Sequence, residues 1–296
     1  MYSQCINAGI PVYPTENYCT NLVNNAELSK NLQTLKQLID KGLKVALIHN
    51  ENLRFHKNFS TELLQLVNSN KDKFLVFAEG IDDSFPFSFK QHNDLCLRLQ
   101  HQQKQLPRVD HTNKTKDLLV LVRRDDANRI NLVKQLESLQ LLDNSYVSVN
   151  AKNCVYTLED DHENYQKDSY RLSEIPYIPH YANSKLSVVM ETNMVEKSYQ
   201  LSEKIYKPIM TEHPFVVLGP PGYLKFLHSH GYETFGDWID ESYDNEQDIS
   251  TRILLIANAC NKFLKSDINN FYHESAIIRR RNREKFFNTI PISLQH

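Results

Sequence analysis

The sequence has little glycine, few cysteines and no long apolar segment. Only 7 of its 296 residues are glycine. The odd number of cysteines, without any C-x-x-C pair, favours free thiols in a reducing compartment over a disulfide framework or a zinc site. No apolar run is long enough to cross a bilayer, and residues 1–15 lack the basic start and apolar core of a signal peptide. We therefore expect a cytoplasmic protein. The cysteines are Cys5, Cys19, Cys96, Cys154 and Cys260.

Charge is nearly balanced along the chain. The formal net charge is −2 and the pI is about 6.6, so the surface as a whole carries no electrostatic footprint for nucleic acid. Charged residues make up 24% and hydrophobic residues 41%, which is typical of a folded globular protein and not of a disordered or collagen-like one. The length allows one large or two ordinary domains, either with a substantial core.

Alternating strand and helix patterns predict an α/β fold in two regions, separated by a polar linker at 90–116 that is in part helical. Apolar strands joined by helices indicate parallel sheets covered on both faces. We expect an N-terminal Rossmann-like domain at 1–110, a second at 111–265, and a basic C-terminal helix at 266–296 that crosses back. The predicted strands are 44–49, 73–77, 117–122, 146–149, 186–190 and 215–218; the predicted helices are 58–67, 127–141, 202–210, 223–230, 251–264 and 268–287.

A Ser-Glu-Lys triplet and a Gly-Pro-Pro-Gly turn stand out in the second region. Ser202 is expected to cap a helix whose first turn holds Glu203 and Lys204, at the carboxyl end of the sheet. The helix start and the lysine suit a phosphorylated ligand, and the glutamate suits a ribose diol. Gly219 and Gly222 would shape the floor of such a pocket; no Walker-type Gly-Lys-Ser/Thr follows them.

These motifs resemble the donor-binding half of the fucosyltransferases that use GDP-fucose, and uncharacterised viral and bacterial glycosyltransferases with TEK-x-x-KPI followed by PFVVLGPPG. The family pattern is a strand ending in Phe-Glu-Asn, a loop with an aromatic residue, and then Thr-Glu-Lys. Here the strand ends in Met-Glu-Thr-Asn at 190–193, the loop holds Tyr199, and the triplet is Ser-Glu-Lys at 202–204. The segment VRRDDANRINLVKQL resembles the family's strand and arginine-led helix, with Arg129 at the arginine position. The resemblance covers about 115–245.

The resemblance implies a GT-B-like architecture, with two Rossmann-like domains facing a crevice, and inverting, metal-independent transfer from a nucleoside diphosphate sugar. Glu203 would hold the ribose, Lys204 and Arg129 the diphosphate, and Asn193 or Glu191 the sugar or its phosphate. No cofactor or metal is expected beyond this donor, for which GDP-fucose is the first candidate. The chain also lacks the Asp-x-Asp triplet of metal-dependent transferases.

Two further contacts and a catalytic base complete the expected site. Lys207 lies on the same helical face as Lys204 and is a second candidate for the phosphates, although a solvated lysine is the plainer interpretation. An inverting enzyme needs a carboxylate base for the acceptor hydroxyl. Glu79, Asp82 and Asp83 follow a predicted strand of the first domain and are the candidates.

Structural interpretations stand beside the functional ones. Ser-Glu-Lys at a helix start is common as simple capping. His213, His228 and His230 have a spacing that suits surface histidines better than a metal site. The basic run at 279–285 is either a solvated helix face or a peripheral contact with an anionic membrane surface or a phosphate-bearing lipid acceptor. The rival to an enzyme is a catalytically silent protein that binds or assembles around a nucleotide sugar.

Overall fold

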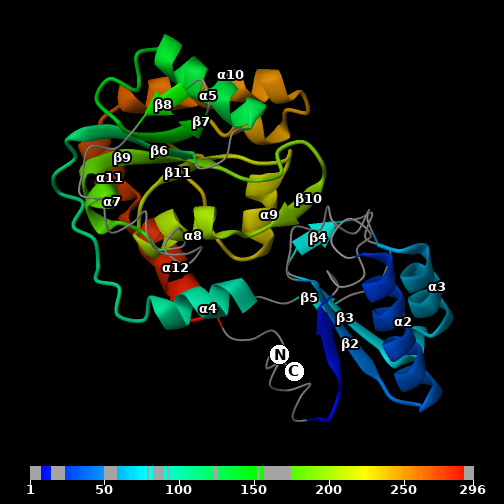
Figure 1. Ribbon diagram of the computed structural model, residues 1–296. Helices are drawn as coiled ribbons and strands as arrows, with labels where there is room; N and C mark the ends of the chain where they lie inside the picture. Colours follow the sequence, from blue (N-terminus) through cyan, green and yellow to red (C-terminus); the bar gives the residue numbers. More distant parts are fainter. Residues whose placement is uncertain are drawn as a thin grey trace. The chain divides into compact units, whose positions relative to one another are not determined.

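The structure is a computed structural model, and it describes residues 8–14, 24–49, 59–78, 80–82, 90–91, 94–122, 126–151, 154–156 and 175–289 (Figure 1). The chain forms two compact units. One contains the described residues up to Leu97 together with Lys197–Gln200, and the other contains Arg98–Glu196 and Leu201–Thr289. Each unit is described by itself below.

The first unit is built on a parallel sheet of four strands in the order β1-β2-β3-β5. The strands predicted at 44–49 and 73–77 correspond to β2 and β3, within one residue at each end. Helix α3 between them begins after Ser60, whose hydroxyl accepts the N–H of Leu63, as a capping serine should. The elements are β1 (Val12–Pro14), α2 (Asn25–Asp40), β2 (Val45–His49), α3 (Thr61–Ser69), the 3-10 turn η3 (Lys71–Lys73), β3 (Phe74–Ala78), β4 (Gly80–Asp82), β5 (Lys90–Gln91) and β10 (Ser198–Gln200).

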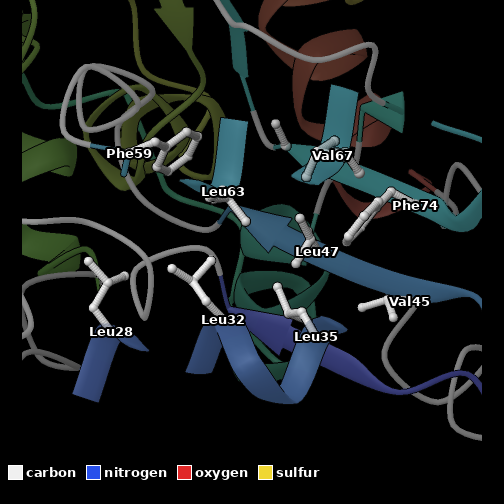
Figure 2. Packing of buried hydrophobic residues seen from close by; sticks show 11 residues of the cluster. Leu28, Leu32, Leu35, Val45, Leu47, Phe59, Leu63, Val67 and Phe74 are labelled. Carbon is white, nitrogen blue, oxygen red and sulfur yellow. The ribbon is translucent and has the colours of Figure 1, made fainter. Parts of the chain in front are cut away.

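Helices α2 and α3 bury one face of this sheet. Helix α2 was not predicted, although Asn24 caps it through the N–H of Glu27 and its leucines recur at helical spacing. Figure 2 shows the helix leucines pointing toward the side chains of β2 and β3. Burial of this apolar surface is the main stabilising contribution to the unit. The packed residues are Leu28, Leu32, Leu35, Val45, Leu47, Phe59, Leu63, Val67, Phe74, Val76 and Ala78.

The second unit is built on a sheet of five strands in the order β11-β9-β6-β7-β8. Four strands are parallel, and β8 joins the edge of β7 in the antiparallel sense. Its strands are β6 (Lys116–Val122), β7 (Tyr146–Ala151), β8 (Cys154–Tyr156), β9 (Ser184–Met190) and β11 (Phe215–Leu218). Its helices are α5 (Ala127–Ser138), α7 (Ile178–Asn183), α8 (Glu203–Met210), α9 (Tyr223–Ser229), the 3-10 turn η5 (Ser242–Asn245), α10 (Ile249–Leu264), α11 (Ile268–Glu274) and α12 (Ala276–Phe287).

Helices lie on both faces of this sheet. In Figure 1, α5 and α10 lie on one side, while α8 and α12 lie on the other. Strand β11 is buried at every position, as expected of a strand covered on both faces. The prediction of an α/β fold with parallel sheets is therefore confirmed, and the GT-B arrangement stays a prediction.

The polar stretch at 90–116 contains regular structure. Helix α4 (Asp94–Gln102) occupies part of it, and the segment after α4 belongs to the second unit. The ring of His111 contacts the backbone carbonyl of Thr211, and Lys114 donates to the carbonyls of Tyr181 and Ala182. These contacts tie the segment to the C-terminal ends of α7 and α8.

The predicted helix at 268–287 is two helices separated by Ser275. Phe271 in α11 packs on Phe263 and Phe235, whereas Phe286 in α12 packs on Tyr206 of α8. Phe271 and Phe286 thus pack against different elements of the unit, and the chain bends between α11 and α12.

The arginines of α12 divide into buried and exposed side chains. Arg279 donates to the carbonyls of Glu212 and Tyr272, and Arg283 donates to the carbonyls of Met210 and Leu106. Arg280 and Arg281 are exposed. The interpretation of the whole run as a solvated face is therefore wrong for two of its arginines, because helix C-terminal carbonyls attract cationic donors.

Across the described parts of the chain, the structure contains no helix long and apolar enough to cross a membrane.

Candidate functional site

The candidate site lies at the carboxyl ends of β6 and β9. These strands are parallel neighbours, with Leu119 beside Ser187 and Val120 beside Val188. Helix α5 begins shortly after β6, and α8 is the first helix after β9, with β10 between them in the sequence. In open α/β sheets this edge is where ligands bind, because helix N-termini and loop backbone converge there.

The first turn of α8 carries the predicted Glu-Lys pair. The Ser202 hydroxyl accepts the N–H of Lys204 at 3.1 Å, so the predicted N-cap is present. The Lys204 ammonium lies 2.7 Å from Oε1 of Glu203, and both side chains are 27% exposed. Burial acts to raise the pKa of Glu203, but the charge and hydrogen bond of Lys204, with a contribution from Lys207, hold that pKa below its ordinary value. The glutamate is therefore ionised at neutral pH, as its ion pair requires.

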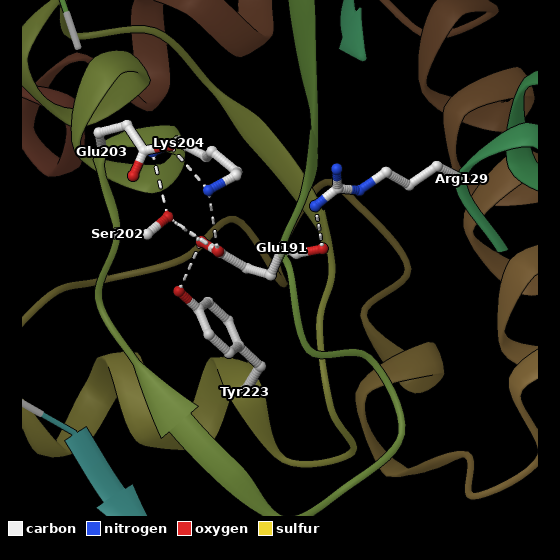
Figure 3. Close-up of polar contacts among 6 residues, drawn as sticks. All are labelled: Arg129, Glu191, Ser202, Glu203, Lys204 and Tyr223. Carbon is white, nitrogen blue, oxygen red and sulfur yellow. Dashed lines mark hydrogen bonds and ion pairs between the residues drawn. The ribbon is translucent and has the colours of Figure 1, made fainter. Parts of the chain in front are cut away.

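Glu191 is a buried carboxylate at the end of β9, and Figure 3 shows it at the centre of a polar network. It is only 5% exposed. The Ser202 hydroxyl lies 2.8 Å from each carboxylate oxygen, and the Tyr223 hydroxyl donates to Oε1 at 3.0 Å. The Lys204 ammonium is 4.0 Å from Oε2. Burial is the main reason that the pKa of Glu191 is raised, against the opposing effect of Lys204.

Tyr223 was not predicted as part of the site. It begins α9, directly after the Gly-Pro-Pro-Gly turn, and is 1% exposed. A Cβ atom at Gly219 would lie 2.8 Å from Cγ of Tyr223, which is closer than carbon atoms pack. Gly222 has a φ of 83°, in the left-handed region that favours glycine, and it is the N-cap of α9. Within the second unit, the two glycines thus admit the tyrosine ring and turn the chain into α9.

Arg129 lies in the first turn of α5, as predicted, and is 4% exposed. Asp126 caps this helix by accepting the N–H groups of Asn128 and Arg129. The Arg129 guanidinium donates to the backbone carbonyl of Glu191 at 2.8 Å, and Figure 3 shows it reaching the backbone and not the carboxylate. The arginine therefore joins α5 to the end of β9 in this structure, and its role toward a diphosphate stays a prediction.

Asn193 closes a turn after β9. It is 7% exposed, its amide donates to the carbonyl of Glu196, and its Oδ1 accepts the N–H groups of Val195 and Glu196. This is the local hydrogen bonding by which asparagine stabilises turns. Its predicted contact with a sugar stays a prediction.

Tyr199 and Asp82 come together in the first unit, although they are far apart in the sequence. Strands β4 and β10 form a two-stranded antiparallel sheet in which Tyr199 pairs with Ile81, and Ser198 pairs with Asp82. The loop residue expected to contact the donor and one of the three base candidates thus share one backbone ladder. The other two base candidates, Glu79 and Asp83, lie outside the described residues.

A hollow lies between α8 and the sheet of the second unit. Lys204 and Lys207 stand on its α8 side. Leu121, on the central strand β6, is 37% exposed. The hollow thus combines an apolar surface with two cations. Its lining is Leu119, Leu121, Tyr181, Ser187, Val188, Val189, Met190, Lys204, Lys207 and Pro208.

The remaining motif residues have structural contacts. His213 is 1% exposed, and its ring nitrogens lie 2.9 Å from the Ser187 hydroxyl and 2.8 Å from the Ser184 carbonyl. The surface assignment is therefore wrong for this histidine, whereas His228 is exposed. Within the described ranges, no group of three or more histidine, cysteine, aspartate or glutamate residues could hold a metal ion. Asp244, which follows α9 in the sequence, accepts the N–H groups of Leu224 and Lys225 at the start of α9.

Comparison with known proteins adds no family assignment. No protein-family model matches the chain, and no curated protein matches its sequence significantly.

Proposed function

We propose that the protein is an inverting, metal-independent glycosyltransferase that moves a sugar from a nucleoside diphosphate sugar to a hydroxyl of a glycan or another acceptor. GDP-fucose is the first donor to test. The observation that supports this most is the position of Lys204. It lies in the first turn of α8, beside Glu203, at the carboxyl end of a parallel sheet and next to a hollow that also exposes Lys207.

The chemistry follows from where charge develops. When the bond between the anomeric carbon and the diphosphate oxygen breaks, negative charge gathers on the diphosphate and the sugar becomes oxocarbenium-like. Lys204 and Lys207, with the first N–H groups of α8, are placed to stabilise that leaving group. Glu203 is the acceptor for a ribose diol. Because Lys204 lines the hollow and Arg129 does not, we assign the diphosphate first to Lys204.

The acceptor hydroxyl attacks the anomeric carbon from the opposite side and loses its proton to a carboxylate. Glu79, Asp82 and Asp83 remain the candidates for this base, and a GT-B arrangement of the two units remains part of the proposal. We expect this reaction to take place in the cytoplasm.

Ligand-dependent thermal stability tests the donor site. The protein is heated with GDP, UDP, ADP or CMP, in buffer alone and then with magnesium or manganese. A nucleotide present at 100 times its Kd stabilises the folded state by about 2.7 kcal/mol. For a unit of this size, that corresponds to a rise in Tm of about 5–10 °C. A rise in Tm with GDP supports GDP-fucose as donor. A rise with UDP still supports a glycosyltransferase, but one that uses a UDP-sugar in place of GDP-fucose.

Two lysine variants make the test specific. Lys204→Ala is expected to weaken diphosphate binding by about 10- to 100-fold, since a hydrogen bond to a charged group contributes about 1.5–3 kcal/mol. Lys225→Ala removes an exposed lysine of α9 and should leave binding unchanged. Equal affinities in the two variants would contradict the assignment of Lys204. Binding without any release of GDP from GDP-fucose in the presence of acceptors would favour a silent nucleotide-sugar-binding protein, and no binding of any nucleotide would overturn the proposal.

A further inference from the structure

The polar network around Glu191 joins three segments of the second unit. Glu191 directly follows β9, Ser202 caps α8, and Tyr223 begins α9. Because the Ser202 hydroxyl also accepts the N–H of Lys204, the position of the first helical turn depends on the carboxylate behind it. Glu191 itself is buried, so it cannot contact a ligand without rearrangement of the network.

Lys204 is shared between two carboxylates. Its ammonium lies 2.7 Å from Glu203 and 4.0 Å from Glu191, as the dashed lines of Figure 3 show. Two carboxylates therefore share one cation at this point. The other charged groups nearby are Lys207, which acts on Glu203 from the same helix, and Arg129 of α5, which reaches the Glu191 backbone. From α9, the neutral Tyr223 faces the carboxylate.

The two carboxylates differ in their access to water. The Glu203 side chain is 27% exposed, so water reaches its carboxylate, and Lys207 also lowers its pKa. The Glu191 side chain is 6% exposed, and without Lys204 its carboxylate would keep the hydroxyl groups of Ser202 and Tyr223 as hydrogen-bond donors but would lose the cation next to it. A buried carboxylate that loses its cationic neighbour favours the protonated form. Burial already raises the pKa of this group with Lys204 in place.

We propose that Glu191 is a positioning residue that holds Lys204 in the ligand-free protein and takes up a proton when a bound diphosphate draws the lysine away. The inference rests on the proposed function, because it requires an anion at Lys204. The exchange is balanced: the ammonium moves from the carboxylate to the phosphate oxygens, and a proton from solvent replaces it on Glu191. Diphosphate binding is thereby linked to pH.

Calorimetric titration of the full chain with GDP, in buffers of different ionisation enthalpy near neutral pH, measures the protons taken up on binding. Wild type is expected to take up roughly half a proton or more in excess of Glu191→Gln. Protons bound by GDP itself are common to both and cancel in the difference. Glu284→Gln is the matched control, since it removes an exposed carboxylate of α12 that the proposed site does not use and should retain the uptake.

The sign of the pH dependence follows from linkage. Because the complex binds more protons than the free protein, the affinity of wild type for GDP relative to Glu191→Gln should increase as the pH falls toward 6. A purely structural role for Glu191 would change the affinity or the stability and would leave the proton count the same.

Tyr223→Phe gives a second test that keeps the carboxylate. Loss of the tyrosine hydroxyl removes a donor that lowers the pKa of Glu191, so the pH range of the linkage should move upward. Equal proton uptake by wild type and Glu191→Gln, with GDP bound to both, would overturn the inference and leave the proposed function intact. If Glu191→Gln does not fold, an unchanged pH profile in Tyr223→Phe overturns it instead. No binding of GDP or of inorganic pyrophosphate to wild type would overturn both proposals together.

Discussion

Gly219→Ala tests the close contact between the Gly-Pro-Pro-Gly turn and Tyr223. The added Cβ would lie 2.8 Å from Cγ of Tyr223, 2.9 Å from Cδ2 and 3.1 Å from Cβ. The ring cannot swing into solvent, because Tyr223 is 1% exposed and its hydroxyl donates to Glu191. Either the ring shifts within a packed core or it loses its hydrogen bond to the carboxylate.

The loss in free energy of unfolding follows from these two outcomes. Overpacking a core costs about 1–3 kcal/mol, and a buried acceptor that loses a donor costs about 1–3 kcal/mol. Alanine also restricts the unfolded chain, which returns about 0.4–1 kcal/mol. After this gain is subtracted from either cost, we expect Gly219→Ala to lower the free energy of unfolding of the second unit by about 1–2 kcal/mol.

Trp238 provides the assay. It is the only tryptophan of the chain and lies in the second unit, where its indole N–H donates to Glu274 and its ring packs on Phe271. Urea unfolding followed by its fluorescence should show a lower midpoint at an unchanged m-value.

A double-mutant cycle identifies the cause. With Tyr223→Ala in the background, the ring is gone and only the 3.1 Å contact with Cβ remains, so Gly219→Ala should lower the free energy of unfolding by clearly less than in wild type. A loss below about 0.5 kcal/mol in the wild-type background, or an equal loss in both backgrounds, would contradict the clash as the cause.

Two further predictions concern the half-buried His111 and the buried Arg279. Burial, followed by the nearby charge of Lys114, lowers the pKa of His111 to about 3, so the unfolded chain binds a proton below about pH 6.5 that the folded chain does not. The stabilising contribution of His111 is therefore present above pH 6.5 and is lost as the pH falls. Between pH 7.5 and 5.0 the free energy of unfolding should fall by about 2 kcal/mol more in wild type than in His111→Gln. Urea unfolding of both proteins at the two pH values measures this difference. Arg279→Met should lower the free energy of unfolding by about 2–4 kcal/mol, because the carbonyls of Glu212 and Tyr272 lose their donor, whereas the exposed Arg280→Met should change it by less than about 0.5 kcal/mol. Equal effects of the two arginine variants, or parallel pH curves for the histidine pair, would contradict these assignments.

Local patterns in the sequence determined most of the strands and the helix starts. The run Phe215–Leu218 is a strand with the predicted bounds, and Ser202 caps α8 as predicted, because both depend on neighbouring residues alone. Helix α2 carries an equally local signal in Asn24 and its spaced leucines. Parallel pairing also followed from the sequence, since apolar strands joined by helices have few other arrangements.

The tertiary structure alone decided what the polar side chains contact. Glu191, Arg129 and Asn193 were predicted to face a ligand, whereas in the structure their polar groups meet Ser202, backbone carbonyls and a local turn. Tyr223 joined the network only because Gly219 leaves room for its ring. Charge and residue type show that a buried polar group needs a hydrogen-bond partner, but the sequence does not show which of several possible donors supplies it. Which donor comes within 3 Å depends on strand order and helix packing, and these bring together residues far apart along the chain.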